Sequence, residues 1–171
     1  MPVGGEAIVG FVIALIFGVS FIYLIFSLYV SYMHWKYCKK IRGLDNTILL
    51  WFAVTHQIVM SDYFIPEEGI SIFNIGIPKN FVKYWWLASA IILGYTSLNQ
   101  NYWFVLLLKL IGVYFKSEYY SRFFAEANNS SIKKEKFLSI ICGLCPFIAA
   151  LRLTFNWRRY KNEKEEYFTE V

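Results

Sequence analysis

Charge is scarce in this 171-residue chain, and one long stretch has none. Asp, Glu, Lys and Arg together make up 17% of the residues, against about 25% in typical soluble domains. None of them occurs between Ala7 and Trp35. About 20 consecutive apolar residues are enough to cross a bilayer as a helix. The scarcity of charge therefore argues against an ordinary soluble domain and favours an integral membrane protein.

Motifs that carry chemistry are also missing. The chain has no P-loop, no G-x-S-x-G nucleophile elbow, no H-E-x-x-H zinc motif and no paired acidic motif of intramembrane proteases or lipid transferases. Its two histidines and three cysteines provide neither a disulfide framework nor an obvious set of four zinc ligands. We therefore expect no catalytic residues, no metal site and no cofactor, and we expect that the protein is not an enzyme.

Apolar runs and breaks divide the chain into helical segments. We predict five helices and a polar tail, at about 7–33, 46–62, 81–98, 102–127, 137–155 and 156–171. A loop over 66–80 and a tight polar turn over 99–101 connect three of them. The segment 116–127 has one apolar and one charged face, which is typical of an amphipathic helix at a membrane interface.

The predicted fold is thus a single all-α, polytopic membrane domain covering residues 1–171. It has four or five membrane helices, one of them short or re-entrant, and the interfacial amphipathic helix. Helices 7–33, 81–98 and 102–127 are the predicted spans, and 137–155 is the fourth. Helix 46–62 is short for a span, so its crossing is left open.

Basic residues predict the orientation. Lys36, Lys39, Lys40 and Arg42 follow the first helix, and the positive-inside rule places this flank in the cytoplasm or matrix and the N-terminus outside. Basic residues beside membrane helices usually set the topology and contact lipid headgroups. The net charge of +5 is therefore interpreted in this way, and we expect no nucleic-acid partner. If all five helices cross, Lys and Arg divide almost equally between the two sides. An excess of Lys and Arg on the inner side arises only if helix 46–62 does not cross the membrane. We expect a bacterial inner membrane or an organellar membrane.

Lys109 is the strongest candidate for a functional side chain. It lies within the apolar run "VLLLKLIG", and a lysine at a bilayer centre costs about 2.5–3.5 kcal/mol on insertion scales. Asp62 and Glu6 are candidate partners, and Arg152 is a second charge within an apolar segment. A buried ion pair or subunit contact, snorkelling to the headgroups, and a transport pathway all stay open.

Cys142 and Cys145 form a C-x-x-C motif in "IICGLCP". A membrane-boundary C-x-x-C resembles that of the quinone-coupled thiol oxidoreductases of the bacterial periplasm, and the resemblance stops at the tetrapeptide. Those enzymes need a second cysteine pair, whereas this chain adds only Cys38. An apolar setting raises the pKa of a thiol and makes it inert. We therefore interpret the motif as small residues at a close helix contact, with redox and metal roles as alternatives.

His56 is followed by Asp62 and Tyr63 near the end of helix 46–62. This stretch resembles the haem- and quinone-binding anchor subunit of succinate dehydrogenase, in which the spacing between His and Asp-Tyr is wider. The resemblance implies His56 and Tyr63 as haem or quinone candidates. His56 and His34 could also ligate one haem between two helices, or His56 could form a hydrogen bond within a helical bundle.

These observations favour a non-catalytic membrane subunit or assembly factor of a larger complex. Its partners would be the lipid bilayer and other membrane protein subunits. The first alternative is a small channel or transporter that uses Lys109 and Asp62. The second is a membrane redox protein that uses the C-x-x-C or a haem or quinone.

Overall fold

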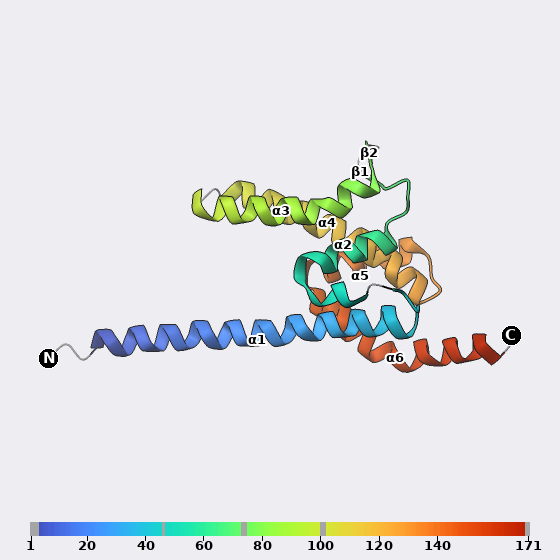
Figure 1. Cartoon of the computed structure of the whole chain (residues 1–171), viewed down its shortest axis with the longest axis horizontal. Coiled ribbons are helices and arrows are strands. Elements are labelled where there is room, and N and C mark those ends of the chain that lie inside the picture. Colours follow the sequence, from blue (N-terminus) through green and yellow to red (C-terminus); the bar gives the residue numbers. More distant parts are fainter. Residues whose placement is uncertain (1–3, 46, 73–74, 100–101, 170–171) are drawn as a thin grey trace.

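The computed structural model describes residues 4–45, 47–72, 75–99 and 102–169 (Figure 1). The side chains of residues 4–7, 53, 96–99 and 163–169 lie outside this description. Helices make up 84% of the structure, which confirms the all-α prediction. The elements are, in order, α1 (Gly4–Lys40), the 3₁₀ helix η1 (Thr47–Trp51), α2 (Ala53–Phe64), β1 (Ile70–Ile72), β2 (Ile75–Ile77), α3 (Lys79–Asn99), α4 (Tyr102–Ala127), α5 (Ile132–Leu144) and α6 (Pro146–Thr169).

The two halves of α1 lie in different surroundings. The N-terminal half extends away from the other helices (Figure 1), and Phe11, Phe17 and Phe21 are 69%, 72% and 63% exposed. The C-terminal half packs against η1 and α6 and buries Met33 and His34. Within the described part of the chain, α1 is the one helix that is long and apolar enough to cross a membrane. We call residues 8–28 the α1 arm.

The pair α3 and α4 forms a second projection, which extends from the rest of the molecule on the same side as the α1 arm (Figure 1). Apolar side chains cover it, including Leu106, Leu107 and Leu110, all about half exposed. Its connection at residues 100–101, part of the predicted polar turn, lies outside the described residues. We call 84–99 and 102–115 the hairpin arm, and residues 29–83 and 116–162 the body.

The core of the body is built around the C-terminal half of α4. Tyr119, Phe123 and Phe124 are all fully buried there. The ring of Phe123 lies 4.8 Å from that of Tyr37 in α1 and 5.0 Å from that of Phe64 in α2, between ring centroids. Such aromatic pairs contribute about 0.5–1.5 kcal/mol each beyond the burial of their area.

The prediction that 116–127 lies at the membrane interface is therefore wrong. The polar face of this segment is buried as well as its apolar face, because α5 covers Ser117, Glu118 and Ser121. Lys136 of α5 forms an ion pair with Glu118. A helix that is enclosed by protein on both faces cannot lay an apolar face on lipid, so this segment is a core helix with internal polar partners.

The predicted helix 46–62 is two short elements. Phe52 takes an extended conformation (φ −108°, ψ 134°) between η1 and α2. Because α2 has only 12 residues, it is about 18 Å long, well short of the roughly 30 Å hydrocarbon core. Its residues Val59, Met60 and Phe64 are buried in the body. This segment is therefore too short to cross as a single helix, and it packs inside the body.

The predicted helix 137–155 is also wrong as a single element. The chain leaves the helical conformation at Cys145 (φ −132°, ψ 89°), between α5 and α6. The ring of Pro146 disfavours a helical conformation at the preceding residue, which explains the break. α5 has 13 residues, too few for a span. Beyond it, α6 stays helical to Thr169, so the predicted tail 156–171 is largely helix.

A small β-hairpin occupies part of the predicted loop 66–80. β1 and β2 pair antiparallel, with Ile70 opposite Ile77. Gly69 precedes them with φ at +85°, and a Cβ atom at this position would lie 1.9 Å from the carbonyl oxygen of Ile77. Glycine is required here because both the backbone conformation and the close approach exclude a side chain.

Candidate functional site

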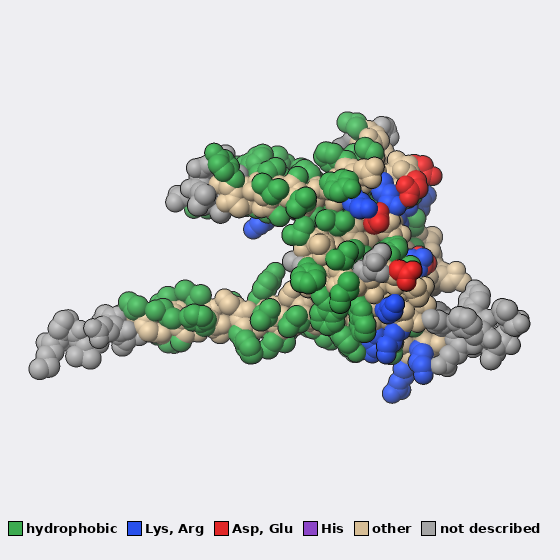
Figure 2. All heavy atoms as spheres, viewed as in Figure 1, with side chains coloured by type: hydrophobic (Ala, Val, Ile, Leu, Met, Phe, Trp, Pro, Cys, Tyr) green, Lys and Arg blue, Asp and Glu red, His purple; other side chains and the backbone are tan. Residues whose placement is uncertain are grey.

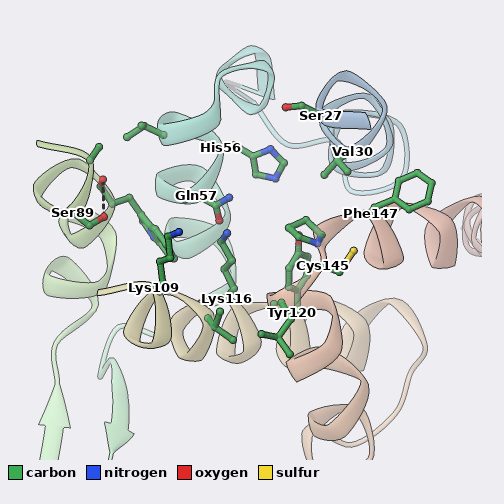
Figure 3. Close-up of a pocket in the computed structure, with 18 of the residues that line it drawn as sticks. Ser27, Val30, His56, Gln57, Ser89, Lys109, Lys116, Tyr120, Cys145 and Phe147 are labelled. Atoms are coloured by element: carbon green, nitrogen blue, oxygen red, sulfur yellow. Dashed lines mark hydrogen bonds between the residues drawn. The ribbon is translucent and has the colours of Figure 1, made fainter. Parts of the chain in front are cut away.

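A cavity of about 660 Å³ lies where the two arms meet the body. Figure 2 shows the hollow between the arms, and Figure 3 shows the side chains around it. The α1 arm contributes Phe26 and Ser27, α3 contributes Trp86 and Ser89, and the junction of α5 and α6 contributes Cys145. The volume falls within the range of about 300–1,000 Å³ that is typical of small-molecule sites.

Lys109 and Lys116 of α4 point into this cavity (Figure 3). They are two helical turns apart and therefore share one face, at a separation of roughly 10 Å along the helix axis. Gly112 lies between them on that face, and a Cβ atom there would lie 3.4 Å from the Trp86 ring. The Nζ atom of Lys116 is 5.8 Å from the centroid of the same ring. The site is therefore positively charged, with an aromatic wall.

The cavity provides no counter-charge to these lysines. No Asp or Glu is among the described residues that line it, and none pairs with Lys109 or Lys116 in the part of the chain that the structure describes. The proposed partner Asp62 instead lies 2.9 Å from Nζ of Lys83 and 3.9 Å from Nζ of Lys79. The side chain of Glu6, the other candidate, lies outside the described residues.

His34 and His56 form a buried pair beside the cavity. Their ring centroids are 4.9 Å apart in an edge-to-face contact. The Nδ1 atom of His34 donates to the carbonyl oxygen of Val30 at 2.8 Å. The Nε2 atoms of both rings are buried and have no hydrogen-bond partner.

This geometry does not fit a haem. Two axial histidines must leave room for an iron and a porphyrin plane, whereas these two rings are in direct contact. The hydroxyl of Tyr63 donates to the carbonyl oxygen of Asp45 at 2.7 Å, so it stabilises the body and is not part of the cavity lining. Burial, followed by the nearby His34, lowers the pKa of His56 well below its ordinary value. His56 is therefore a neutral ring with one free nitrogen.

The two cysteines of the C-x-x-C differ in their surroundings. Cys142 is fully buried, and burial raises the pKa of its thiol to about 11. Cys145 is exposed at the helix break and lines the cavity. Between them, Gly143 lies against α4, where a Cβ atom would be 2.9 Å from the carbonyl oxygen of Val113. Among the described residues, no group of three His, Cys, Asp or Glu side chains could hold a metal ion.

Arg152 belongs to a different part of the body. Its Nη2 atom donates to Glu135 at 2.6 Å, and its guanidinium lies 4.1 Å from the centroid of the Phe124 ring. Glu135 also accepts hydrogen bonds from Asn128 and Ser130. Burial raises the pKa of Glu135, but these hydrogen bonds outweigh it and the net shift is downward. Arg152 thus connects α6 to α5 and, through Glu135, to the connection of α4 and α5, and it is not part of the cavity lining.

The sequence alone did not identify Lys116 or Tyr120 as part of one site with Lys109 and His56. The spacing of seven residues from Lys109 was the available signal for Lys116, because it places both lysines on one face. Comparison with protein-family models, curated proteins and solved structures found no match for this chain. Two lysines, a neutral histidine and apolar walls can bind an amphiphilic anion.

Proposed function

We propose that this protein is a non-catalytic subunit of a larger membrane complex, with both arms embedded in the same bilayer. The hairpin arm contributes residues 84–99 and 102–115, which are 16 and 14 residues long, or about 24 and 21 Å of helix. This arm therefore crosses a roughly 30 Å hydrocarbon core where the bilayer thins around it. The arms extend from the body in one direction (Figure 1). Helices that enter one bilayer from the same side must extend in the same direction, as these arms do.

The distribution of charge supports this placement. Residues 1–35 contain no Lys or Arg, and residues 84–115 contain only Lys109. Every other Lys and Arg therefore belongs to the body or to the end of α6, and charged side chains gather on the body in Figure 2. By the positive-inside rule, the body then lies in the cytoplasm or matrix, with the N-terminus and the connection of α3 and α4 on the far side.

The uncovered arms support a role as a subunit. None of the most apolar stretch of α1 is buried within the chain, and Leu107 and Leu110 of the hairpin arm are exposed as well. Membrane helices associate by close packing against other helices. A self-contained channel or transporter would pack its own spans together around a pathway, whereas these two arms leave their surfaces for other molecules. This lack of mutual packing is the observation on which the proposal depends.

Cysteine accessibility in the native membrane tests the placement. In a cysteine-free background, Glu67→Cys and Asn129→Cys in the body should react with an impermeant maleimide only after the inner face is opened. Gln100→Cys, in the connection of α3 and α4, should react from the outside. Labelling of Glu67→Cys and Asn129→Cys from opposite faces would contradict a body that lies on one side.

Site-specific photocrosslinking in cells tests the subunit role. A photoreactive residue at Val19 in the α1 arm and another at Leu106 in the hairpin arm should each form an adduct with the same partner protein. Phe137, which is exposed on the body, serves as the matched control for an exposed apolar position outside the arms. Adducts with lipid alone at both arm positions would count against a complex.

A further inference from the structure

We propose that the cavity binds one anionic phospholipid, with its phosphate between Lys109 and Lys116 and its acyl chains along the apolar walls between the arms. This inference rests on the membrane placement proposed above, because only that placement opens the cavity to lipid. It does not depend on whether the protein belongs to a larger complex.

Charge complementarity is the first argument. Two ammonium groups face a cavity whose described lining contains no carboxylate. In surroundings of low dielectric, positive charges without counter-ions attract an anion far more strongly than they do in water. Lys116 is half-buried, so solvent cannot fully replace a ligand there. Because the two side chains project from one helix face, both can reach a single phosphate placed between them.

The walls are the second argument. Apolar side chains of α1 and α3, among them Phe26, Val30, Ala90 and Leu93, line the cavity. These apolar surfaces continue into the exposed arms, where Phe17, Phe21 and Leu107 point outward. A ligand that fits has an anionic head at the lysines and a long apolar part toward the arms. A free inorganic anion would leave the apolar walls without a partner.

Unpartnered buried polar atoms are the third argument. His56 is 4% exposed, lines the cavity and has an Nε2 atom without a hydrogen bond. The hydroxyl of the fully buried Tyr120, also in the lining, has no hydrogen bond of good geometry. Buried polar groups of folded proteins normally have partners. The unpartnered Nε2 of a neutral imidazole can donate or accept a hydrogen bond, and either role suits a hydroxyl of the lipid headgroup.

These features together indicate a hydroxyl-bearing anionic headgroup, for which phosphatidylglycerol is a suitable probe. The full chain, purified in mild detergent, should be titrated with dioleoyl-phosphatidylglycerol and with dioleoyl-phosphatidylcholine. Native mass spectrometry then counts bound lipids, and thermal unfolding reports stabilisation. We expect one phosphatidylglycerol to bind at least about tenfold more tightly than phosphatidylcholine, because hydrogen bonds to charged groups are the stronger ones.

Two variants target the two halves of the site. Lys109→Gln/Lys116→Gln should abolish the preference for phosphatidylglycerol, and Ala90→Phe should block both lipids by filling the apolar side. Lys133→Gln/Lys134→Gln is the matched control, since it removes the same charge from two exposed lysines of the body. An unchanged helical circular dichroism spectrum shows that each variant is folded. If the double variant does not fold, Lys109→Arg/Lys116→Arg should retain the preference.

Three results would overturn the proposal. The first is equal affinity of the unmodified protein for the two lipids. The second is a preference for phosphatidylglycerol that survives Lys109→Gln/Lys116→Gln. The third is full stabilisation by inorganic phosphate at the same concentration, which would identify a site for a free anion instead of a lipid. Each is measured on the isolated chain, so it is distinguishable from failure of the topology or crosslinking experiments.

Discussion

Lys109 and Lys116 lie on one face of α4 and line the same cavity, and no carboxylate of the described residues pairs with either. Lys116 is half-buried and Lys109 is exposed, so in the empty cavity the charge of Lys116 is partly removed from water without a carboxylate to compensate it, which costs stability. Such an arrangement persists in proteins where a ligand or partner compensates it. The effect of these lysines on the stability of the protein can be measured without lipid, separately from their effect on lipid binding.

Removing the half-buried charge of Lys116 should stabilise the protein when no lipid is bound. We expect Lys116→Met to raise the melting temperature in detergent without added lipid, by a gain of about 0.5–2 kcal/mol. For a chain of this size, 1 kcal/mol corresponds to about 2–4 °C. Lys133→Met, at an exposed position, should change stability by less than about 0.5 kcal/mol. A lower melting temperature for Lys116→Met would show that the lysine has a stabilising partner.

Breaking the buried ion pair of Glu135 and Arg152 should strongly lower the free energy of unfolding. We expect Glu135→Ala to cost about 3–5 kcal/mol, because it leaves the guanidinium buried without its partner. Glu67→Ala is the control. Its carboxylate also accepts a hydrogen bond from a lysine, but its side chain is 89% exposed, and exposed pairs contribute about 0–1 kcal/mol. Chemical unfolding of both variants measures the difference, and equal losses would contradict it.

The same pair predicts a pH dependence. The pKa of Glu135 in the folded protein is lowered from its reference value of 4.5. Its contribution to stability is therefore fully present above pH 4.5 and is lost as the pH falls from there through the folded pKa. Glu135→Gln should show a flatter melting temperature below that pH than the unmodified protein. Parallel acid profiles for the two proteins would exclude this contribution.

Gly143 should not tolerate a side chain. A Cβ atom there would lie 2.9 Å from the backbone oxygen of Val113, so Gly143→Ala must separate α5 from α4. We expect a loss of about 1–3 kcal/mol, as for other overpacked sites. Gly18→Ala in the α1 arm meets no atom within 4 Å and should be neutral or stabilising, because alanine favours helix. Thermal unfolding compares the two variants.

The native thiols should differ in reactivity. Cys38 and Cys142 are fully buried, and the Cys142 thiol, with a pKa raised to about 11, stays protonated near pH 7. We expect a small maleimide to modify Cys145 alone in the native protein and all three cysteines after unfolding. Peptide mass spectrometry identifies the modified residues. Fast labelling of Cys142 in the native state would revive the redox hypothesis for the C-x-x-C.

Several features follow from the sequence with little dependence on the rest of the chain. The charge-free run before Lys36 predicts a long apolar helix, and α1 spans Gly4–Lys40. The predicted segments 81–98 and 102–127 match α3 and α4 closely. Local periodicity and turn residues determine such elements, because a helix satisfies its own backbone hydrogen bonds.

Other predictions failed where packing against helices distant in sequence outweighs the residue pattern of the segment itself. The amphipathic pattern of 116–127 indicates an apolar face, but the pattern alone does not say whether lipid, α1 or α2 covers that face. Pro146 is a signal for the break at Cys145, but the continuous apolar run of 137–155 favours a single helix. The strands of 70–77 are too short to show an alternating pattern.

Composition and local spacing alone predict an all-α chain with an apolar N-terminal helix, long stretches almost without charge, and an unusual Lys109 within one of them. These are properties of composition and local spacing. Long-range packing places Lys109 and Lys116 around one cavity with His56, pairs Asp62 with Lys83, and buries Cys142 fully. Each of these depends on side chains from helices distant in sequence, whose packing no single segment encodes.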